Sequence, residues 1–486
     1  MNWVKKRKLP ATKVIKFNNR PCLTPESLWN ALHSSFNMVL FHQIDFNILN
    51  EVACKPTQEW NPFSRHEFKS VISKCNDSSS PGPDRLTWRY WKIIIANNDC
   101  LSRIINIANA CIKLGHWPKY FKVSTTIVIP KPNKSLYDHP KAFCPIVLLN
   151  TLSKLIEKVI AERLQFIVAS NNFIHPCQLG GLKFKSTADA GIALTHIIRS
   201  GWARGRSTSS LSFDVAQFFP SLNHRLLILI LEKAGLDPKV LAFFVNYLMQ
   251  ISTTYLWNNL SSPLLEVNVR VGQGSALSPI LFSLYLSLLL YILENRLKNL
   301  NIPVSILSFV DDGLLIAQNK SFIISNSNLF CSYNILSKLL DSFGLAIEHS
   351  KTEIFHFSRS QGTFNPPPLN LSILRGPILW PKDLWRYLGF IFDRKLSFHK
   401  HIDYYANKAL STVKCMKLLG NLSWGICYGT LNTNNFYFLF FYFILFYFFY
   451  FSFSFSFSLF YFAGKTMKKA RDKEVTWQIT WCDVTF

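Results

Sequence analysis

The segment that most constrains the fold is SILSFVDDGLLIAQ, residues 305–318, in which two apolar runs enclose two adjacent acidic residues. Apolar runs of this length on either side of a turn predict the two strands of a β-hairpin. Gly313 follows Asp311 and Asp312, and an Asp-Gly pair favours a two-residue turn because it tolerates positive φ. Neighbouring carboxylates at the tip of a buried hairpin are costly unless a cation lies between them. Taken alone, the segment fits either a solvated Asp-Gly turn or a metal site.

The composition favours a polyanionic partner. The 486 residues include 53 Lys and Arg against 28 Asp and Glu, a formal net charge of +25. Such an excess favours nucleic acid or an anionic membrane surface and says nothing about the fold. The 11 cysteines show no CxxC pair and no Cys/His cluster at zinc spacing, so we expect reduced thiols in an intracellular protein.

The first ten residues, MNWVKKRKLP, are basic and have no apolar stretch behind them, so we do not expect a secretory signal. The run Lys5-Lys6-Arg7-Lys8 is compatible with a nuclear signal and with a solvated flexible terminus. We therefore expect a nuclear or cytoplasmic protein that is not secreted.

Two segments in the first half suggest a basic loop beside a core helix. Residues 124–129, STTIVI, predict a strand that leads into the loop PKPNK, whose Lys131 and Lys134 either contact phosphates or form a basic surface turn. Residues 152–164 carry apolar side chains at helical spacing and predict a helix packed on a core. We expect its solvated face to carry Lys154, Glu157, Lys158 and Glu162.

Further along, the predicted elements carry scattered polar groups. A strand over residues 211–215 contains Asp214, and the Gly- and Ser-rich loop VGQGSALSP, residues 271–279, precedes a predicted apolar helix at 280–297. Such a loop at a helix N-terminus suits the close approach of a backbone to a ligand. We also expect a helix at 330–342, strands at 347–357 and 387–392, and a basic helix at 399–420.

Residues 436–462 are almost entirely Phe, Tyr, Leu, Ile and Ser. Their length and apolarity pass the test for a membrane-spanning helix. These residue types also share pyrimidine-rich codons, so the segment is equally what a translated pyrimidine tract would give. We favour the tract, and no membrane association, because no other part of the sequence is patterned for a membrane.

Five segments occur in an order typical of one family: SFDVAQFFPSLNH, GQGSALSPILFSLYLS, SFVDDG, HSKTEIFHF and RYLGFIFDRKLSFHKHI. In content and order they resemble the reverse transcriptases of non-LTR (LINE-type) retrotransposons, over about residues 81–401. The resemblance implies an α+β fold, a right-hand polymerase with fingers and a βαββ palm whose antiparallel sheet packs on helices. It implies RNA-directed DNA polymerase activity, and we expect a partial open reading frame with an incomplete thumb.

The resemblance also implies catalytic residues. Asp214, Asp311 and Asp312 match the three acids that hold two Mg²⁺ ions, with Mn²⁺ as an alternative. Two such ions about 3.5–4 Å apart stabilise the attacking and leaving oxygens of an in-line phosphoryl transfer. Lys351 matches a lysine that protonates the leaving pyrophosphate, whereas without the resemblance it would be a surface lysine.

The substrates implied are template RNA, a DNA primer end and deoxynucleoside triphosphates. Phe219 matches the residue that stacks under the incoming sugar, although a core phenylalanine is the simpler interpretation. Gln273 and Gly274 match the loop that contacts nucleotide and template. Lys131 and Lys134 fall in the fingers, where basic residues would meet the triphosphate.

The sequence departs from the family pattern at two positions. Cys144 stands where the family usually has an arginine in an Arg-Pro-Ile motif, and a neutral thiol cannot replace a forked cation on phosphate. Trp424 stands where related sequences have arginine. An alternative function is therefore a degenerate, inactive remnant that at most binds nucleic acid.

The expected domain organisation follows the resemblance. It comprises a linker or N-terminal extension at 1–75, N-terminal extension and fingers at 76–210, a reverse transcriptase domain at 112–392, the start of the thumb at 393–430, a Phe-rich segment at 434–463 and an unstructured tail at 464–486.

Overall fold

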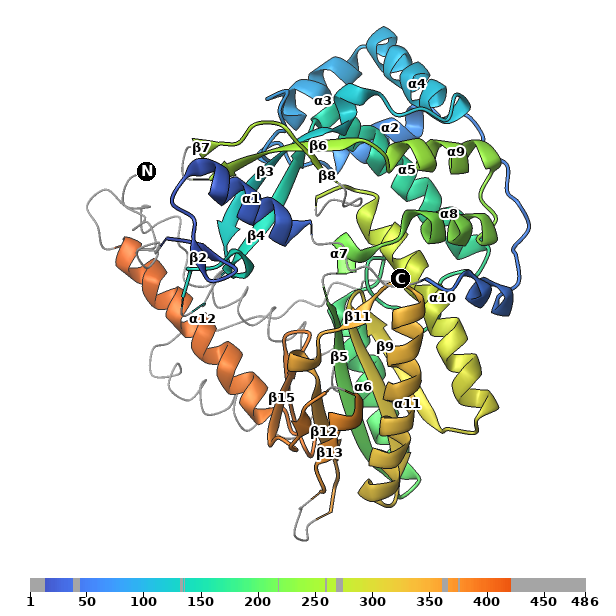
Figure 1. The fold of residues 1–486 in the computed structure, drawn as a ribbon, viewed down its shortest axis with the longest axis vertical. Coiled ribbons are helices and arrows are strands. Elements are labelled where there is room, and N and C mark those ends of the chain that lie inside the picture. The colour runs from blue at the N-terminus through green and yellow to red at the C-terminus, as the bar shows by residue number, and fades with distance from the viewer. Residues whose placement is uncertain are drawn as a thin grey trace, which may run out of the picture. The chain divides into compact units, whose positions relative to one another are not determined.

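The computed structural model describes residues 14–37, 44–131, 134, 136–216, 218–257, 260–267, 274–360, 366–374 and 376–420. The Phe-rich segment, Trp424 and the tail lie outside the described residues. The chain divides into two units, residues 1–398 and 399–486. The expected α+β class is confirmed, because helices and several small sheets follow one another along the first unit (Figure 1).

The N-terminal part of the first unit is mostly helical. Its elements are β1 (Lys16–Phe17), β2 (Arg20–Pro21), α1 (Pro25–Phe36), the 3-10 helix η1 (Phe46–Glu51), α2 (Arg65–Ser73), α3 (Trp88–Ala96) and α4 (Asn98–Lys113). Trp29 of α1 and Phe68 of α2 are buried. A linker would leave such side chains in water. The described part of residues 1–75 therefore belongs to the folded first unit.

A first sheet follows these helices. The expected strand at 124–129 is confirmed as β3 (Val123–Pro130), which pairs antiparallel with β4 (Phe143–Leu149) and parallel with β6 (Ile251–Trp257). The short strands β7 (Leu260–Ser261) and β8 (Leu265–Val267) pair with β6. The 3-10 helix η2 (Lys119–Lys122) precedes β3, and η3 (Pro140–Ala142) precedes β4. Two long helices follow β4 in the chain, α5 (Thr151–Ser170) and α6 (Thr187–Ala203).

A second sheet holds the acidic residues. Its central strand β5 (Ser207–Ala216) pairs antiparallel with β10 (Asp312–Asn319) on one side and with β11 (Ala346–Ile347) and β12 (Glu353–Phe357) on the other. At the edge, β9 (Val304–Phe309) forms a hairpin with β10. The expected strand around Asp214 and the expected hairpin are thus confirmed as adjacent strands of one sheet.

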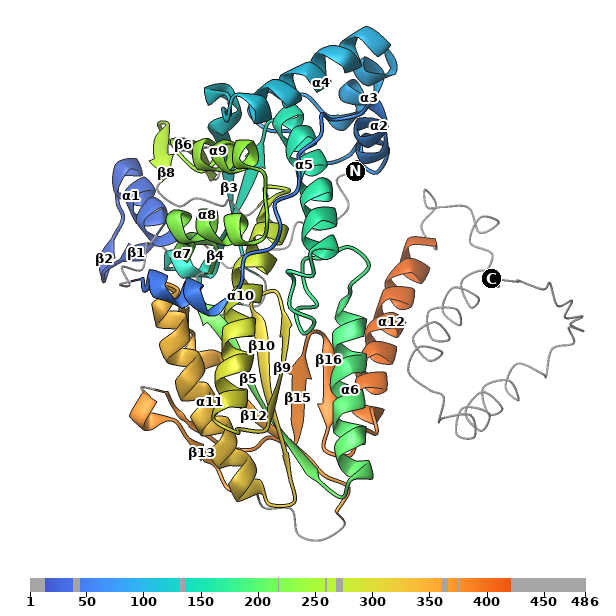
Figure 2. The ribbon, with the colours of Figure 1, turned by 90° about the vertical axis from the view of Figure 1, so that its right-hand side faces the viewer.

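Helices pack against this second sheet (Figure 2). Between β5 and β9 the chain forms α7 (Phe218–Ser221), α8 (His224–Lys233), α9 (Pro238–Tyr247) and the expected apolar helix α10 (Ser278–Asn299). The helix expected at 330–342 is longer than predicted, as α11 (Phe322–Ser342). Leu211 and Val215 of β5 and Leu315 of β10 share the main hydrophobic core with α10 and α11.

Helix α10 is long and apolar enough to cross a membrane by length and composition alone. Its side chains are mostly buried within the protein, including Phe282, Tyr285 and Leu289. A helix that is apolar on all sides because it runs through a core passes the same test. Among the described residues, α10 is therefore explained by packing in the core.

Two predicted strands differ from what is observed. The strand expected at 347–357 is interrupted by the 3-10 helix η4 (His349–Lys351), which separates β11 from β12. The strand expected at 387–392 is instead a hairpin of β15 (Leu384–Tyr387) and β16 (Phe390–Asp393). Leu388 and Gly389 have φ of 47° and 88°, the left-handed values that a tight hairpin turn requires. Apolar periodicity alone could not reveal either break.

The end of the first unit also contains the short strands β13 (Leu369–Asn370) and β14 (Ile378–Leu379), with the 3-10 helix η5 (Ser372–Leu374) between them. Trp385 of β15 stacks on Phe355 of β12, with ring centroids 5.9 Å apart, so the β15–β16 hairpin covers part of the second sheet. In the second unit, the expected basic helix is confirmed as α12 (His399–Gly420).

Candidate active site

The three predicted acids meet at one end of the second sheet. Asp214 lies near the C-terminal end of β5, and Asp312 is the first residue of β10. In the antiparallel register the two residues are direct partners. Asp311 precedes Asp312 in the hairpin turn. Directly paired residues in neighbouring strands have Cβ atoms about 4.5–5.5 Å apart, so the pairing brings together acids that are far apart in sequence.

The hairpin turn lies two residues earlier than the sequence predicts. Phe309 pairs with Asp312, so the two turn residues are Val310 and Asp311, and the expected Asp312-Gly313 turn is wrong. Val310 adopts φ of 58°. Gly313 lies inside β10 opposite Phe213, where a Cβ atom would overlap the Phe213 ring. The glycine is thus required by close packing against an aromatic side chain.

Partial burial controls the electrostatics of the acid pair, in which Asp311 is half-buried and Asp312 is exposed. It raises the pKa of Asp312 to about 6, and the charges of Asp311 and Asp214 act in the same direction. Burial also raises the pKa of Asp311, with a further contribution from Asp214. Among the described residues no basic side chain forms an ion pair with Asp311 or Asp312. The charge of Lys351 acts on both acids without a direct contact and lowers their pKa, but burial and the neighbouring carboxylates outweigh it.

Lys351 is the cation that the structure brings to this site. Its Nζ forms an ion pair and a hydrogen bond with Asp214 Oδ2. Burial disfavours the charged form of Lys351, but the hydrogen bond and charge of Asp214 outweigh it and raise the lysine pKa. Lys351 was expected within a strand and lies instead in η4. Just before η4, the Glu348 N–H donates to Asp214 O at 2.8 Å, which holds this turn next to β5.

The other predicted site residues lie in less defined places. Gln273 lies outside the described residues. Gly274 is the first described residue of the next range, with φ of 132°, a value that favours glycine, and its backbone lies against Val147 of β4. Phe219 lies in α7, the element that follows β5 in the chain, and its side chain is not among those that the structure describes.

The two lysines of the basic loop follow β3. The Lys131 N–H donates to Ala142 O at 2.9 Å, which holds the start of the loop next to β4, and Lys134 is exposed. No hydrogen bond or ion pair joins either lysine to the three acids among the described residues. Cys144 is half-buried in β4 and pairs with Ile129 of β3, so it lies beside the strand that carries the loop.

Glu157 is a residue whose position the sequence reasoning predicted wrongly. It was expected on the solvated face of its helix, but it is 1% exposed, and burial raises its pKa. Its carboxylate accepts hydrogen bonds from Tyr247 OH at 3.1 Å, Ser275 Oγ at 2.8 Å and Ala276 N–H at 3.1 Å. These contacts fasten the loop after Gly274 to α5. One sequence signal was missed: apolar residues occur three, four and seven positions after Glu157, which places Glu157 on the apolar face of the helix.

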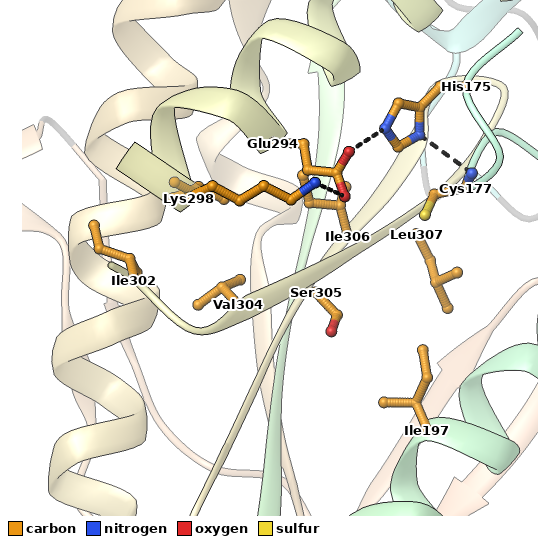
Figure 3. A pocket seen from close by; sticks show the side chains of 11 residues that line it. His175, Cys177, Ile197, Glu294, Lys298, Ile302, Val304, Ser305, Ile306 and Leu307 are labelled. Carbon is orange, nitrogen blue, oxygen red and sulfur yellow. Dashed lines mark hydrogen bonds and ion pairs between the residues drawn. The ribbon is translucent and has the colours of Figure 1, made fainter. Parts of the chain in front are cut away.

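A cavity of about 270 Å³ lies along β9, away from the acids. Its lining is mostly aliphatic, with His175, Glu294 and Lys298 at one side (Figure 3). His175 Nε2 lies 3.4 Å from Glu294 Oε2, and His175 Nδ1 accepts the Cys177 N–H at 3.2 Å. Both ring nitrogens of His175 are therefore occupied, and the three acids do not line this cavity. The acid site is the better candidate for chemistry.

The paired acids and the adjacent lysine at one end of the second sheet define a candidate active site. The family described as "Reverse transcriptase (RNA-dependent DNA polymerase)" matches residues 129–392, more than half of the chain. The chain belongs to this reverse transcriptase family.

Curated relatives agree with this assignment. The chain is 26% identical over 344 residues to a Pol polyprotein from the retrotransposable element R2 of Popillia japonica, covering 68% of this chain and 45% of the relative. It is 23% identical over 369 residues to the RNA-directed DNA polymerase of the mobile element jockey of Drosophila melanogaster, covering 74% and 39%. It is 26% identical over 372 residues to a probable polymerase of the transposon BS of the same species, covering 75% and 38%. The chain thus spans less than half the length of these relatives and is related to the enzymes of non-LTR retrotransposons.

Proposed function

We propose that this chain contains the polymerase region of a non-LTR retrotransposon enzyme that copies RNA into DNA. The observation that carries the proposal is the direct pairing of Asp214 with Asp312, next to Asp311. In the proposed organisation the second sheet is the palm, the first sheet belongs to the fingers, and α12 begins the thumb. The substrates would be template RNA, a DNA primer end and deoxynucleoside triphosphates, which the net charge of +25 attracts.

The donor set fits a hard divalent cation. Three carboxylates supply oxygen ligands, which Mg²⁺ prefers, and Mn²⁺ accepts the same ligands. As the side chains stand, no group of three or more His, Cys, Asp or Glu among the described residues is arranged to hold a metal ion. In this arrangement the ion pair with Lys351 directs the Asp214 carboxylate toward an ammonium group. Bound metal would supply Lewis-acid stabilisation of charge on the phosphate oxygens.

The protein groups then have separate roles. Asp214, Asp311 and Asp312 hold negative charge at the end of the sheet and would bind the metal ions. Lys351 forms an ion pair with Asp214 that raises its pKa, and as an ammonium group it would give a proton to the leaving pyrophosphate. Phe219, Gln273 and Gly274 would bind the incoming nucleotide.

The basic loop would complete the nucleotide site. Lys131 and Lys134 follow β3 and would approach the triphosphate as point charges. Cys144 lies in the neighbouring strand at the family's usual arginine position, so this chain would bind triphosphate with one cation fewer.

A primer-extension assay tests the proposal. The chain should extend a DNA primer on an RNA template with Mg²⁺, and Asp311→Asn should abolish extension without weakening RNA binding. A wild-type chain that binds RNA and extends nothing would support the inactive remnant instead.

The remnant alternative rests on Cys144. If this position once contacted triphosphate, Cys144→Arg should lower the apparent KM for deoxynucleotides by about tenfold. Cys144→Lys provides the matched control, since it restores charge without the forked geometry. An unchanged KM in Cys144→Arg would remove Cys144 from the nucleotide site.

A further inference from the structure

Residues 175–181 run alongside the hairpin that carries the acid pair. The Leu179 N–H donates to Ser308 O at 2.8 Å, and the Ser308 N–H donates to Cys177 O at 2.9 Å. Gln178 and Ser308 form a parallel β-bridge. This 175–181 segment thus extends the outer edge of β9 over the last residues before the turn.

Gln178 reaches from this segment to the turn itself. The side chain is 1% exposed, and its Oε1 accepts the Val310 N–H at 3.2 Å and the Gly180 N–H at 3.1 Å. Both partners are backbone N–H donors, so the oxygen, and not the nitrogen, must face them. The Nε2 atom has no hydrogen-bond partner among the described residues. The polar contribution of Gln178 therefore lies in its oxygen.

Val310 needs such a partner. A β-branched residue with φ of 58° is strained and persists only where its surroundings hold it. Its N–H would otherwise be an unpaired backbone donor in a half-buried turn. Because Asp311 and Asp312 follow immediately, the conformation of Val310 sets the direction in which both carboxylates leave the hairpin.

The glycines of the segment allow this close approach. A Cβ atom at Gly180 would overlap the Val310 backbone nitrogen and its Cγ2. A Cβ atom at Gly181, which has φ of 74°, would come within 2.7 Å of Ser283 Oγ. The segment therefore lies against the turn on one side and against α10 on the other, with no room for larger residues.

The 175–181 segment is fixed to α10 at two places. At one end, His175 contacts Glu294, and the Cys177 N–H occupies the other ring nitrogen (Figure 3). At the other end, Ser283 Oγ donates to Gly180 O at 3.0 Å. Gln178 lies between these two anchors, so the contact with Val310 starts from a rigid base and not from a loose loop.

We infer that Gln178 is a positioning residue for the acid pair: its side-chain oxygen holds the Val310 turn so that Asp311 and Asp312 face Asp214. This inference rests on the proposed polymerase function for its catalytic consequence. Its structural content, the contact between Gln178 and the Val310 N–H, stands independently of activity.

The first measurement is Mn²⁺ binding to the full chain, followed by electron paramagnetic resonance of the free ion. Gln178→Met has nearly the same volume but no acceptor, and should weaken Mn²⁺ binding and slow single-nucleotide incorporation by about tenfold each. The matched control is Gln318→Met at the far end of β10, where Gln318 Nε2 donates to Ile197 O at 2.6 Å. This variant should bind Mn²⁺ like the wild type. Equal Mn²⁺ affinity in Gln178→Met and wild type would overturn the inference.

The second measurement is amide hydrogen exchange at Val310, resolved by fragment mass spectrometry. In the wild type, Val310 should exchange as slowly as the amides of β10, and in Gln178→Met about tenfold faster or more. Fast exchange at Val310 in the wild type overturns the inference even if the variant does not fold. A wild type that binds no Mn²⁺ contradicts the proposed function, whereas the exchange result still decides the role of Gln178.

Discussion

At the scale of single residues, the site is defined by partly buried carboxylates whose charges the protein only partly compensates. Asp312 shows this most clearly, because burial, Asp311 and Asp214 all raise its pKa, to about 6. The ion pair that is present joins Lys351 to Asp214. A site that is left negative in this way has a stability cost that a cation would relieve.

This cost can be measured through Asp312→Asn. The raised pKa means that the folded state binds a proton more tightly than the unfolded state, so the free energy of unfolding falls as pH rises from about 4 to about 6. The variant removes the penalty and should be more stable than wild type at pH 7.5 by about 1 kcal/mol, after discounting for solvent screening. Urea denaturation should show the difference vanishing at pH 3.5. The exposed Asp341→Asn is the control, and a destabilised Asp312→Asn would contradict the burial argument.

Lys351 has two separable roles, as counter-ion of Asp214 and as proton donor. Arginine keeps the charge but does not give up a proton in proteins. If Lys351 gives the proton to pyrophosphate, Lys351→Arg and Lys351→Met should both slow single-turnover incorporation by about a hundredfold. Recovery of the rate in Lys351→Arg would leave the counter-ion role alone.

At the scale of elements, the sequence predicts what periodicity and order can carry. The strand of Asp214, the hairpin of the acid pair and α10 lie where their patterns indicate. The turn at Val310 and Asp311 was missed because Asp312-Gly313 is the pair whose residue types favour a two-residue turn. In the structure Gly313 lies instead within β10, packed against the Phe213 ring. Tertiary contacts of this kind leave no local pattern.

The buried polar groups were missed for a related reason. Glu157 is held by Tyr247 and by the loop at Ser275, residues far from it in sequence. Gln178 is likewise held by the backbone of Val310, 132 positions away. A charged or amide side chain on a helix or loop is normally solvated. Its burial can therefore be recognised only when the positions of its hydrogen-bond partners, distant in sequence, are known.

The packing of Gly313 gives a prediction for the hairpin. Gly313→Ala should destabilise the protein by about 2 kcal/mol, because the new methyl group overlaps the Phe213 ring between paired strands. In a Phe213→Ala background the same change should cost markedly less, as a double-mutant cycle in urea would show. Equal costs in both backgrounds would mean that Phe213 is not what excludes a side chain at position 313.

At the scale of the whole molecule, the chain comprises an α+β unit of the reverse transcriptase family and a second unit whose described part is α12. The net charge of +25 predicts that binding to RNA is dominated by phosphate contacts. The affinity for an RNA–DNA hybrid should then fall by about a thousandfold between 50 and 200 mM salt. Asp311→Asn should show the same salt dependence. A dissociation constant that does not respond to salt would exclude this mode of binding.

The central claim is that Asp214, Asp311 and Asp312 act together in nucleotide addition. The most direct test is single-turnover incorporation of a deoxynucleotide on an RNA template with Mg²⁺, by wild type and by the three single Asp→Asn variants. Binding of the same primer–template is measured on each preparation. The wild type should incorporate the nucleotide and the variants should show no detectable incorporation, with binding unchanged. Incorporation that survives in any of the three variants would contradict it.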